Sequence, residues 1–503
     1  MGGEASSRGY PPPATRRWIT LFTMAAAVMN QVDTTIANVA LPHMQGSTSA
    51  SREQITWVLT SYIVASAIFT PLAGWLASRY GRKKLMLLSI AGFTFASGLC
   101  GIALNLDQLI AFRILQGMSG AALVPMSQAA LLDNYPVKEH GKAMSIFSLA
   151  AIVGPIAGPL LGGWLTANFS WRWVFLINLP LGVVAFFGLA AVMPESRAAE
   201  RPRLDLTGYA LLALAMGAGQ LMLDRGQMLD WFSSGQVVAL GVMAAACLYL
   251  FVVHSLTTPK PFVSLAIFTD RNFVLSSVIG FFLGIMIYTP MSLLPVMLEE
   301  LMGYPIMQIG LVLAPRGAGV LVSTLLIGRI INRVDIRYLV LTGLACNGVA
   351  MAMMSNMSLE ADSHLVIISG LVQGAGSSLI FVPLTTMAFS TLAPHFRNEA
   401  SAMMTLLRNF GASVGIAVMQ AVLVRNVATV QSRLVEGVRP DSPVAQFARP
   451  GMVETLGDAP QAAYHDVVRQ ALMVSYVNAF WALFLMVLAT LPLVMLLRPP
   501  RRL

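Results

Sequence analysis

Fourteen apolar segments, each about 20 residues long, constrain the fold of this 503-residue chain more than any other feature. A segment of that length crosses the hydrocarbon core of a bilayer as one helix, because backbone groups that face lipid must bond within the helix itself. The sequence therefore predicts an all-α integral membrane protein with fourteen transmembrane helices. The predicted spans are 18–41, 55–77, 85–104, 106–131, 143–167, 173–193, 206–223, 237–255, 273–298, 307–331, 338–357, 364–389, 400–424 and 472–497.

Charge and composition agree with a membrane location. Apolar residues make up 56% of the chain and charged residues 11%, a ratio that a soluble domain of this size would not tolerate. The net charge of +9 comes from short clusters between the spans, which is typical of membrane orientation and not of nucleic-acid binding. The 32 Lys and Arg residues divide into 21 on the side of both termini, counting Arg329 at the end of span 307–331, eight on the other side and three well within spans. The positive-inside rule then predicts that both termini are cytoplasmic.

Enzyme and ATPase chemistry lack the residues that they need. The three cysteines, Cys100, Cys247 and Cys346, each lie within an apolar segment, and the six histidines lie at or outside span ends. This pattern predicts neither a metal site nor a cofactor. No phosphate-binding loop of the G-x-x-x-x-G-K type occurs, so ATP is not the expected energy source.

Internal repetition divides the chain. The spacing predicts an N-terminal six-helix half at 1–200, an inserted helix pair at 201–260 and a C-terminal six-helix half at 261–503, an organisation typical of transporters. The repeated residues, offset by 254 or 257 positions, are Gln116-Gly117 and Gln373-Gly374, Gly154 and Gly158 with Gly411 and Gly415, and Gly74 and Arg79 with Gly328 and Arg333.

Charged residues within spans are the strongest indication of a functional site, because a charge near the bilayer centre is costly and faces a cavity or a partner. Asp33 is the only carboxylate well inside a span, and Arg113 and Arg316 lie at about the same depth. Two interpretations stay open here: a structural Asp33–Arg113 ion pair, or a carboxylate that alternates between arginine and a proton. The candidates for proton coupling are Asp33, Arg113, Glu299 and Glu300.

The balance of charge within the spans also bears on the substrate. Three arginines against one carboxylate predict a cationic cavity, which favours weakly acidic or anionic compounds over purely cationic drugs. The 30 methionines and the aromatic residues of the central spans are explained mostly by packing, although such side chains also suit varied apolar ligands. The candidate cavity residues are Asn38, Gln116, Tyr288, Arg316, Phe381 and Arg408.

Two glycine-bearing segments predict moving parts. The segment 74–84 joins two spans through a tight cationic turn, which is either an ordinary positively charged inner loop or a gate. Gly154, Gly158 and Gly162 share one helix face, where they permit close approach of another helix; plain helix packing is the alternative to a flexing interface. The gating candidates are Gly74, Arg79, Gly81, Arg82, Gly154, Gly158, Pro159, Gly162 and Gly163.

These motifs resemble those of a known family. Segment 74–84 resembles the loop motif of the major facilitator superfamily, 109–117 its fourth-helix motif and 154–163 the fifth-helix motif of its antiporters. Segments 32–42 and 171–180 resemble the fourteen-helix drug:proton antiporters, and 223–234 together with the long penultimate loop is similar to the EmrB type. The chain departs from the family at Ser78, where an Asp is usual, and at Ala150, where a Gly is usual.

The resemblance implies a proton-coupled exporter of small amphipathic molecules in a Gram-negative inner membrane. It further implies assembly with a periplasmic adaptor (EmrA-like) and an outer-membrane channel (TolC-like), for which the loop at 425–471 is the expected contact. A dedicated exporter of a fatty acid or a siderophore is the alternative within transport. A membrane enzyme or ligand sensor is disfavoured, since no catalytic cluster and no long cytoplasmic segment is present in the sequence.

Overall fold

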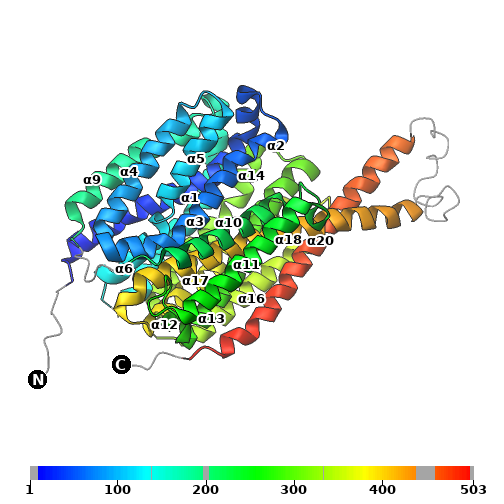
Figure 1. The fold of residues 1–503 in the computed structure, drawn as a ribbon. Coiled ribbons are helices and arrows are strands. Elements are labelled where there is room, and N and C mark those ends of the chain that lie inside the picture. Colours follow the sequence, from blue (N-terminus) through cyan, green and yellow to red (C-terminus); the bar gives the residue numbers. More distant parts are fainter. Residues whose placement is uncertain (1–9, 137–138, 196–202, 332, 438–458, 499–503) are drawn as a thin grey trace, which may run out of the picture.

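The computed structural model describes residues 10–136, 139–195, 203–331, 333–437 and 459–498, and every regular element among them is helical. Figure 1 shows a single elongated bundle of helices with a helical hairpin projecting from one end. The long elements are α1 (Pro13–Thr48), α3 (Trp57–Tyr80), α4 (Arg82–Gly101), α5 (Leu106–Gly120), α6 (Leu123–Asn134), α7 (His140–Asn168), α9 (Asn178–Val192), α10 (Leu206–Gly226), α11 (Gly235–Thr257), α13 (Arg271–Val296), α14 (Ile306–Leu313), α15 (Pro315–Ile330), α16 (Ile336–Met354), α17 (Ser363–Ser390), α18 (Arg397–Gly437) and α20 (Ala459–Met495). The short ones include α2 (Arg52–Ile55), α8 (Trp173–Leu176), α12 (Ala266–Thr269), η3 (Met297–Leu301) and η4 (Pro394–Phe396).

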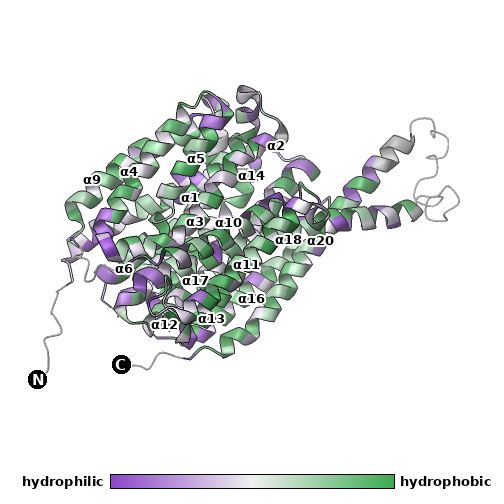
Figure 2. Cartoon of the chain, viewed as in Figure 1, coloured by the Kyte–Doolittle hydropathy of each residue, from purple (hydrophilic) through white to green (hydrophobic). Residues whose placement is uncertain are grey.

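The helices coincide with the predicted membrane spans, and the predicted all-α membrane fold is confirmed. Twelve described helical segments are long and apolar enough to cross a membrane. Helices α1 and α7, of 36 and 29 residues, pack in the same bundle and account for the other two predicted spans. Figure 2 shows apolar residues over most of the bundle, with hydrophilic residues gathered toward its ends and on the projecting hairpin.

Helices α10 and α11, which the sequence predicts as an inserted pair, lie on the outside of the bundle. Helix α10 packs on α3 and on α18, so it touches elements from both predicted halves. Helix α11 packs mainly on α10, and only 6% of the residues in its most apolar stretch are buried. An apolar helix so exposed in a membrane protein faces lipid.

The repeated glycines occupy equivalent places in the two predicted halves. A side chain added at Gly154 of α7 would meet the backbone of Gln31 in α1 at 3.0 Å, and one added at Gly411 of α18 would meet the backbone of Phe281 in α13 at 2.9 Å. Only glycine allows helix backbones to approach this closely. The sequence repeat therefore marks one helix contact that is used twice.

Helices α18 and α20 extend well beyond the predicted membrane boundary. Helix α18 continues past residue 424 to Gly437, and α20 begins at Ala459, before the predicted span start at 472. Much of the segment 425–471, predicted as a loop, is thus helical, and 438–458 lies outside the described residues. Figure 1 shows this hairpin projecting from the end of the bundle opposite to both termini.

Candidate functional site

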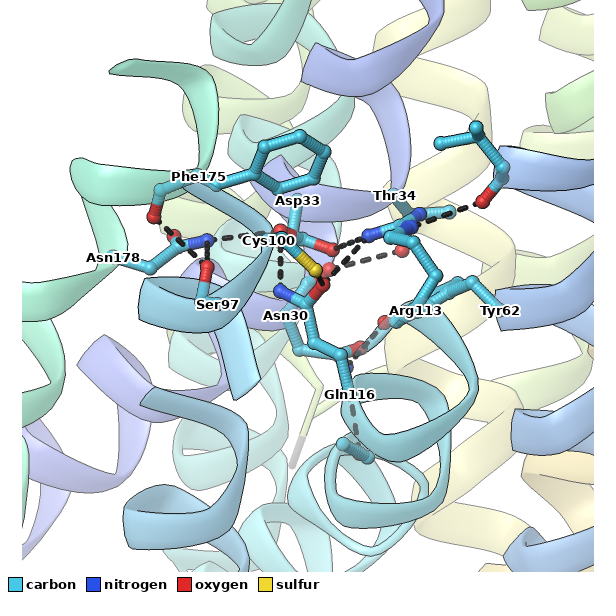
Figure 3. Close-up of polar contacts among 12 residues, drawn as sticks. Asn30, Asp33, Thr34, Tyr62, Ser97, Cys100, Arg113, Gln116, Phe175 and Asn178 are labelled. Atoms are coloured by element: carbon cyan, nitrogen blue, oxygen red, sulfur yellow. Dashed lines mark hydrogen bonds and ion pairs between the residues drawn. The ribbon is translucent and has the colours of Figure 1, made fainter. Parts of the chain in front are cut away.

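Asp33 and Arg113 form an ion pair in the interior of the bundle. Helix α1 presents Asp33 toward α5, and Arg113 Nη1 lies 2.7 Å from Asp33 Oδ2. Neither residue is exposed at all. The two residues that the sequence places at one depth are therefore in direct contact (Figure 3).

Two amides complete the shell around the carboxylate. Gln116 Nε2 and Asn178 Nδ2 both donate to Asp33 Oδ1, at 2.8 Å and 2.9 Å. Gln116 also accepts from Arg113 Nη1 at 2.9 Å, and Asn178 donates to Ser97 Oγ at 3.0 Å. Figure 3 shows that these three side chains, Arg113, Gln116 and Asn178, converge on the Asp33 carboxylate. Asp33 itself is fully buried.

Helix α3 holds the other side of the arginine. Arg113 Nε donates to the carbonyl of Val58 at 3.0 Å, and its guanidinium carbon lies 4.1 Å from the centroid of the Tyr62 ring. The Tyr62 hydroxyl accepts from Asn30 Nδ2 at 2.9 Å, which fixes the ring against α1. The ion pair therefore joins α1, α3, α5 and α9.

The arrangement can exchange an ion pair for a proton. A buried pair is stable only while both charges are matched, and removing one partner costs about 3–5 kcal/mol. Protonation of Asp33 would cancel its charge but keep the hydrogen bonds from Gln116 and Asn178, which do not require an ion. Arg113 would then lose its counter-charge and its hold on α1. The geometry thus offers one way to link proton binding to helix movement.

Other predicted residues lie apart from this cluster. Glu299 and Glu300 are exposed in η3, which contacts Arg469 of α20 through Leu301, and Asn38 is exposed on α1. Their proposed roles in coupling and in the cavity stay predictions. Arg316 is buried in α15 and donates to the amide oxygen of Gln373.

A second group of predicted cavity residues gathers between the predicted halves. Phe381 of α17 stacks on Phe147 of α7 with ring centroids 6.2 Å apart. Arg408 of α18 lies 5.1 Å from the centroid of the Phe381 ring. Tyr288 of α13 accepts a hydrogen bond from Gln31 of α1 at 3.3 Å. Elements from both ends of the sequence therefore meet at these side chains.

The loop-motif residue Arg82 links α6 and α18 at one end of the bundle, in a group of contacts with Asp133, Arg397 and Asn398 that we call the lock. Its Nη1 lies 2.6 Å from Asp133 Oδ2 at the end of α6, and its Nε donates to Asn398 Oδ1 of α18 at 3.1 Å. Arg397 of α18 pairs with the other oxygen of Asp133 at 2.9 Å. Because α18 begins here and ends in the projecting hairpin, this lock lies at the termini end of the bundle.

Backbone geometry and packing support the lock. Gly81 has φ of +88°, a conformation that favours glycine, and it turns the chain from α3 into α4 so that Arg82 faces α6. A side chain added at Gly74 would meet the Cα of Glu399 at 3.0 Å, so α3 and α18 touch nearly backbone to backbone. Ser78, where the family usually has Asp, donates to the carbonyl of Gly74 at 3.0 Å. The carboxylate of the lock comes from Asp133 instead.

The remaining gating candidates follow the same helices. Arg79 lies 5.3 Å from the Trp75 ring. Side chains added at Gly158 or Gly162 would collide with α1 around Thr35 and Ile36. Gly163 is partly exposed, and the side chain of Pro159 lies outside the part of α7 that the structure describes.

Several contacts could not be found from charge alone. Asn178 and Tyr62 are uncharged, and their signal in the sequence is only a polar atom inside an apolar segment. Asp133 and Asn398 lie at helix ends, where polar residues are ordinary. The contact between Arg82 and Asn398 joins residues 316 positions apart, so only the tertiary fold brings them together.

A membrane bundle with a repeated helix contact and a buried ion pair in its interior is typical of secondary transporters. Comparison with known proteins agrees. The chain belongs to the major facilitator superfamily, whose family model matches residues 23–416. Within that superfamily it is an EmrB-type exporter.

Two of its relatives match over almost their whole length. The fatty acid resistance protein FarB of Neisseria gonorrhoeae is 36% identical, with 98% of each chain covered. The multidrug export protein EmrB of Escherichia coli K12 is 35% identical over 96% of this chain and 95% of its own. The solved structure of the proton:xylose symporter XylE has a TM-score of 0.60 at 14% identity, covering 94% of this chain and 95% of that chain, which shows the shared fold.

Proposed function

We propose that this protein exports amphipathic compounds, weakly acidic or hydrophobic in character, across a bacterial inner membrane in exchange for protons. The observation that carries the proposal is the fully buried Asp33–Arg113 pair, in which a carboxylate without solvent contact is held by an arginine from another helix. Its relatives are named for multidrug export and for fatty acid resistance, which supports efflux of toxic amphiphiles and a range broader than one fatty acid or siderophore.

In the proposed cycle, a cavity between two six-helix halves, 1–200 and 261–503, opens alternately to each side of the membrane. The pair at 201–260 packs on the outside of these halves. The 21 basic residues on the side of the termini support a cytoplasmic location for both termini. The lock of Arg82, Asp133 and Arg397 would then close the cytoplasmic end. Breaking the lock would open the cavity inward, and re-forming it would present the cavity to the periplasm.

Inside-out membrane vesicles test proton exchange directly. Respiring vesicles acidify their interior, and a substrate entering by antiport should release protons and reduce that pH difference, followed with a pH-sensitive dye. A medium-chain fatty acid and a bile salt should give a larger response than a cationic dye, relative to vesicles without the protein. Equal responses in both kinds of vesicle would contradict proton-coupled export, and a dominant response to the cationic dye would contradict the preference for acids.

The projecting hairpin is the proposed contact for a periplasmic adaptor of the EmrA type, which would lead to an outer-membrane channel of the TolC type. In this hairpin, α18 ends at Gly437 and α20 begins at Ala459. Near its base, Arg469 donates to the carbonyl of Leu301 at 3.5 Å. Deleting 435–460 removes the tip but no predicted span. We expect the vesicle response to persist and copurification of the adaptor to fall to background. Undiminished copurification would remove the hairpin tip from the interface.

A further inference from the structure

The two predicted halves bury their cations differently. In the N-terminal half, Arg113 is neutralised by Asp33 at 2.7 Å. In the C-terminal half, Arg316 and Arg408 are each 7% exposed, and no carboxylate of the described residues lies within ion-pair distance of either. An unmatched cation in the interior of a membrane protein is costly, and it normally finds an anion.

The repeated helix contact shows where the acid is missing. Gly154 packs on Gln31 of α1, and its repeat Gly411 packs on Phe281 of α13. Equivalent positions of α1 and α13 are therefore 250 residues apart. The same offset sets Leu283, which is 1% exposed, in the place of Asp33. The C-terminal half therefore holds a leucine where the N-terminal half holds its carboxylate.

Arg316 has a neutral partner within the protein. Gln116-Gly117 in the N-terminal half packs on α3 at Tyr62, and Gln373-Gly374 packs on α15 at Arg316, so Arg316 occupies the place of Tyr62. Its guanidinium donates to Gln373, whose own Nε2 donates to the carbonyl of Met286 at 3.0 Å. These hydrogen bonds connect Arg316 only to other helices of the predicted C-terminal half.

Arg408 has no such partner. Its buried Nε makes no hydrogen bond with any described residue. Its guanidinium carbon lies 5.1 Å from the centroid of the Phe381 ring, and Tyr288 is close enough to interact with its charge. Glu399, the nearer of the two carboxylates on the same helix, lies nine residues earlier, about 13 Å along the axis. Arg408 is thus a nearly buried cation with aromatic neighbours and free donor capacity.

The position of Arg408 adds the second condition for a binding site. Tyr288 contacts Gln31, and Phe381 stacks on Phe147, so both neighbours of Arg408 touch the N-terminal half. The side chain therefore stands where the two predicted halves meet and not within one of them. Packing of α18 on α13 is close here, since a side chain at Gly284 would meet Ala412 N at 3.1 Å. The backbone that carries Arg408 is held firmly.

We infer that Arg408 binds the acidic head group of the exported molecule, a carboxylate or a similar oxyanion, with Phe381 and Tyr288 against the start of its apolar tail. This inference rests on the proposed export function. A guanidinium presents paired donors that match a carboxylate, and aromatic rings accept an alkyl chain without demanding one shape. In this scheme Asp33 binds the proton within the N-terminal half, and Arg408 binds the substrate anion where the two halves meet.

Binding of matched ligands to the full chain in lipid nanodiscs tests the inference. Laurate and dodecanol have the same chain length but differ in the charged head. Wild-type protein should bind laurate about tenfold more tightly than dodecanol, after subtraction of binding to empty nanodiscs. Arg408→Gln should lose that preference while its dodecanol affinity stays within about twofold, and Arg408→Lys should retain part of the preference. An unchanged preference for laurate in Arg408→Gln would overturn the assignment.

Two further measurements separate the possible failures. If Arg408→Gln does not fold, a photoreactive laurate on wild-type protein should label peptides of α13, α17 and α18 around residues 288, 381 and 408; labelling confined to lipid-facing α11 would overturn the assignment. Wild-type vesicles report on export independently. A proton response to laurate that survives in Arg408→Gln with unchanged concentration dependence would refute the anchor and leave export standing, whereas no response in wild type would refute the proposed function itself.

Discussion

Asp33→Asn is expected to abolish uphill export driven by a proton gradient while leaving substrate binding measurable. Asparagine keeps the shape of the side chain and can accept from Gln116 or Asn178, but it cannot take up and release a proton. The apolar and aromatic residues between the halves are untouched by the substitution. Transport in vesicles should therefore fall to the level of vesicles without the protein, and ligand binding to purified protein should persist.

The same substitution should also lower stability, since it leaves Arg113 buried without a counter-charge. The expected penalty is about 3–5 kcal/mol, seen as a lower unfolding temperature in detergent. The double variant Asp33→Asn/Arg113→Gln removes both charges and should recover much of that stability. It should still not transport. Recovery of transport together with stability would mean that the pair is only structural.

Covalent closure of the lock should stop transport completely and reversibly. Asp133 and Arg397 join the predicted halves at the termini end, and both side chains are partly accessible, with exposed fractions of 41% and 14%. In a chain without its three native cysteines, Asp133→Cys/Arg397→Cys should be linked by a short bis-methanethiosulfonate, which joins the two thiols through reducible disulfides. The linked protein cannot open that end, so export should cease, and a reducing agent should restore it.

The single-cysteine variants are the controls for this experiment. Each loses the same native contact but cannot be bridged, so the reagent should leave its remaining transport unchanged. Purified linked protein should still bind ligand from the end that stays open. Continued export by fully linked protein would show that the contact between Asp133 and Arg397 need not separate during the cycle.

The sequence predicts spans better than helix ends. Apolar length decides where a helix must be shielded from water, and each predicted span coincides with one or two helices of the bundle. The polar continuations of α18 and α20 carry no such signal, because a helix outside the bilayer needs no apolar run. For that reason the segment 425–471 is predicted as a loop although much of it is helical.

The candidate site follows the same division. A charge inside a span is conspicuous, so Asp33 and Arg113 can be selected and paired by depth alone. The amide of Asn178 is less costly to bury, and the sequence offers no comparable reason to place it beside Asp33. The isolation of Arg408 is likewise a property of the fold, since only packing shows that no acid among the described residues pairs with it.

Proton release on substrate binding tests the central claim most directly. Purified protein in weakly buffered detergent is mixed with substrate equilibrated at the same pH, and a pH indicator records protons set free. Wild-type protein should release protons in proportion to the ligand bound, and Asp33→Asn at matched folding should bind ligand and release none. Full proton release by the Asp33→Asn variant would contradict the account and move the coupling site elsewhere, with Glu299 and Glu300 the next residues to replace.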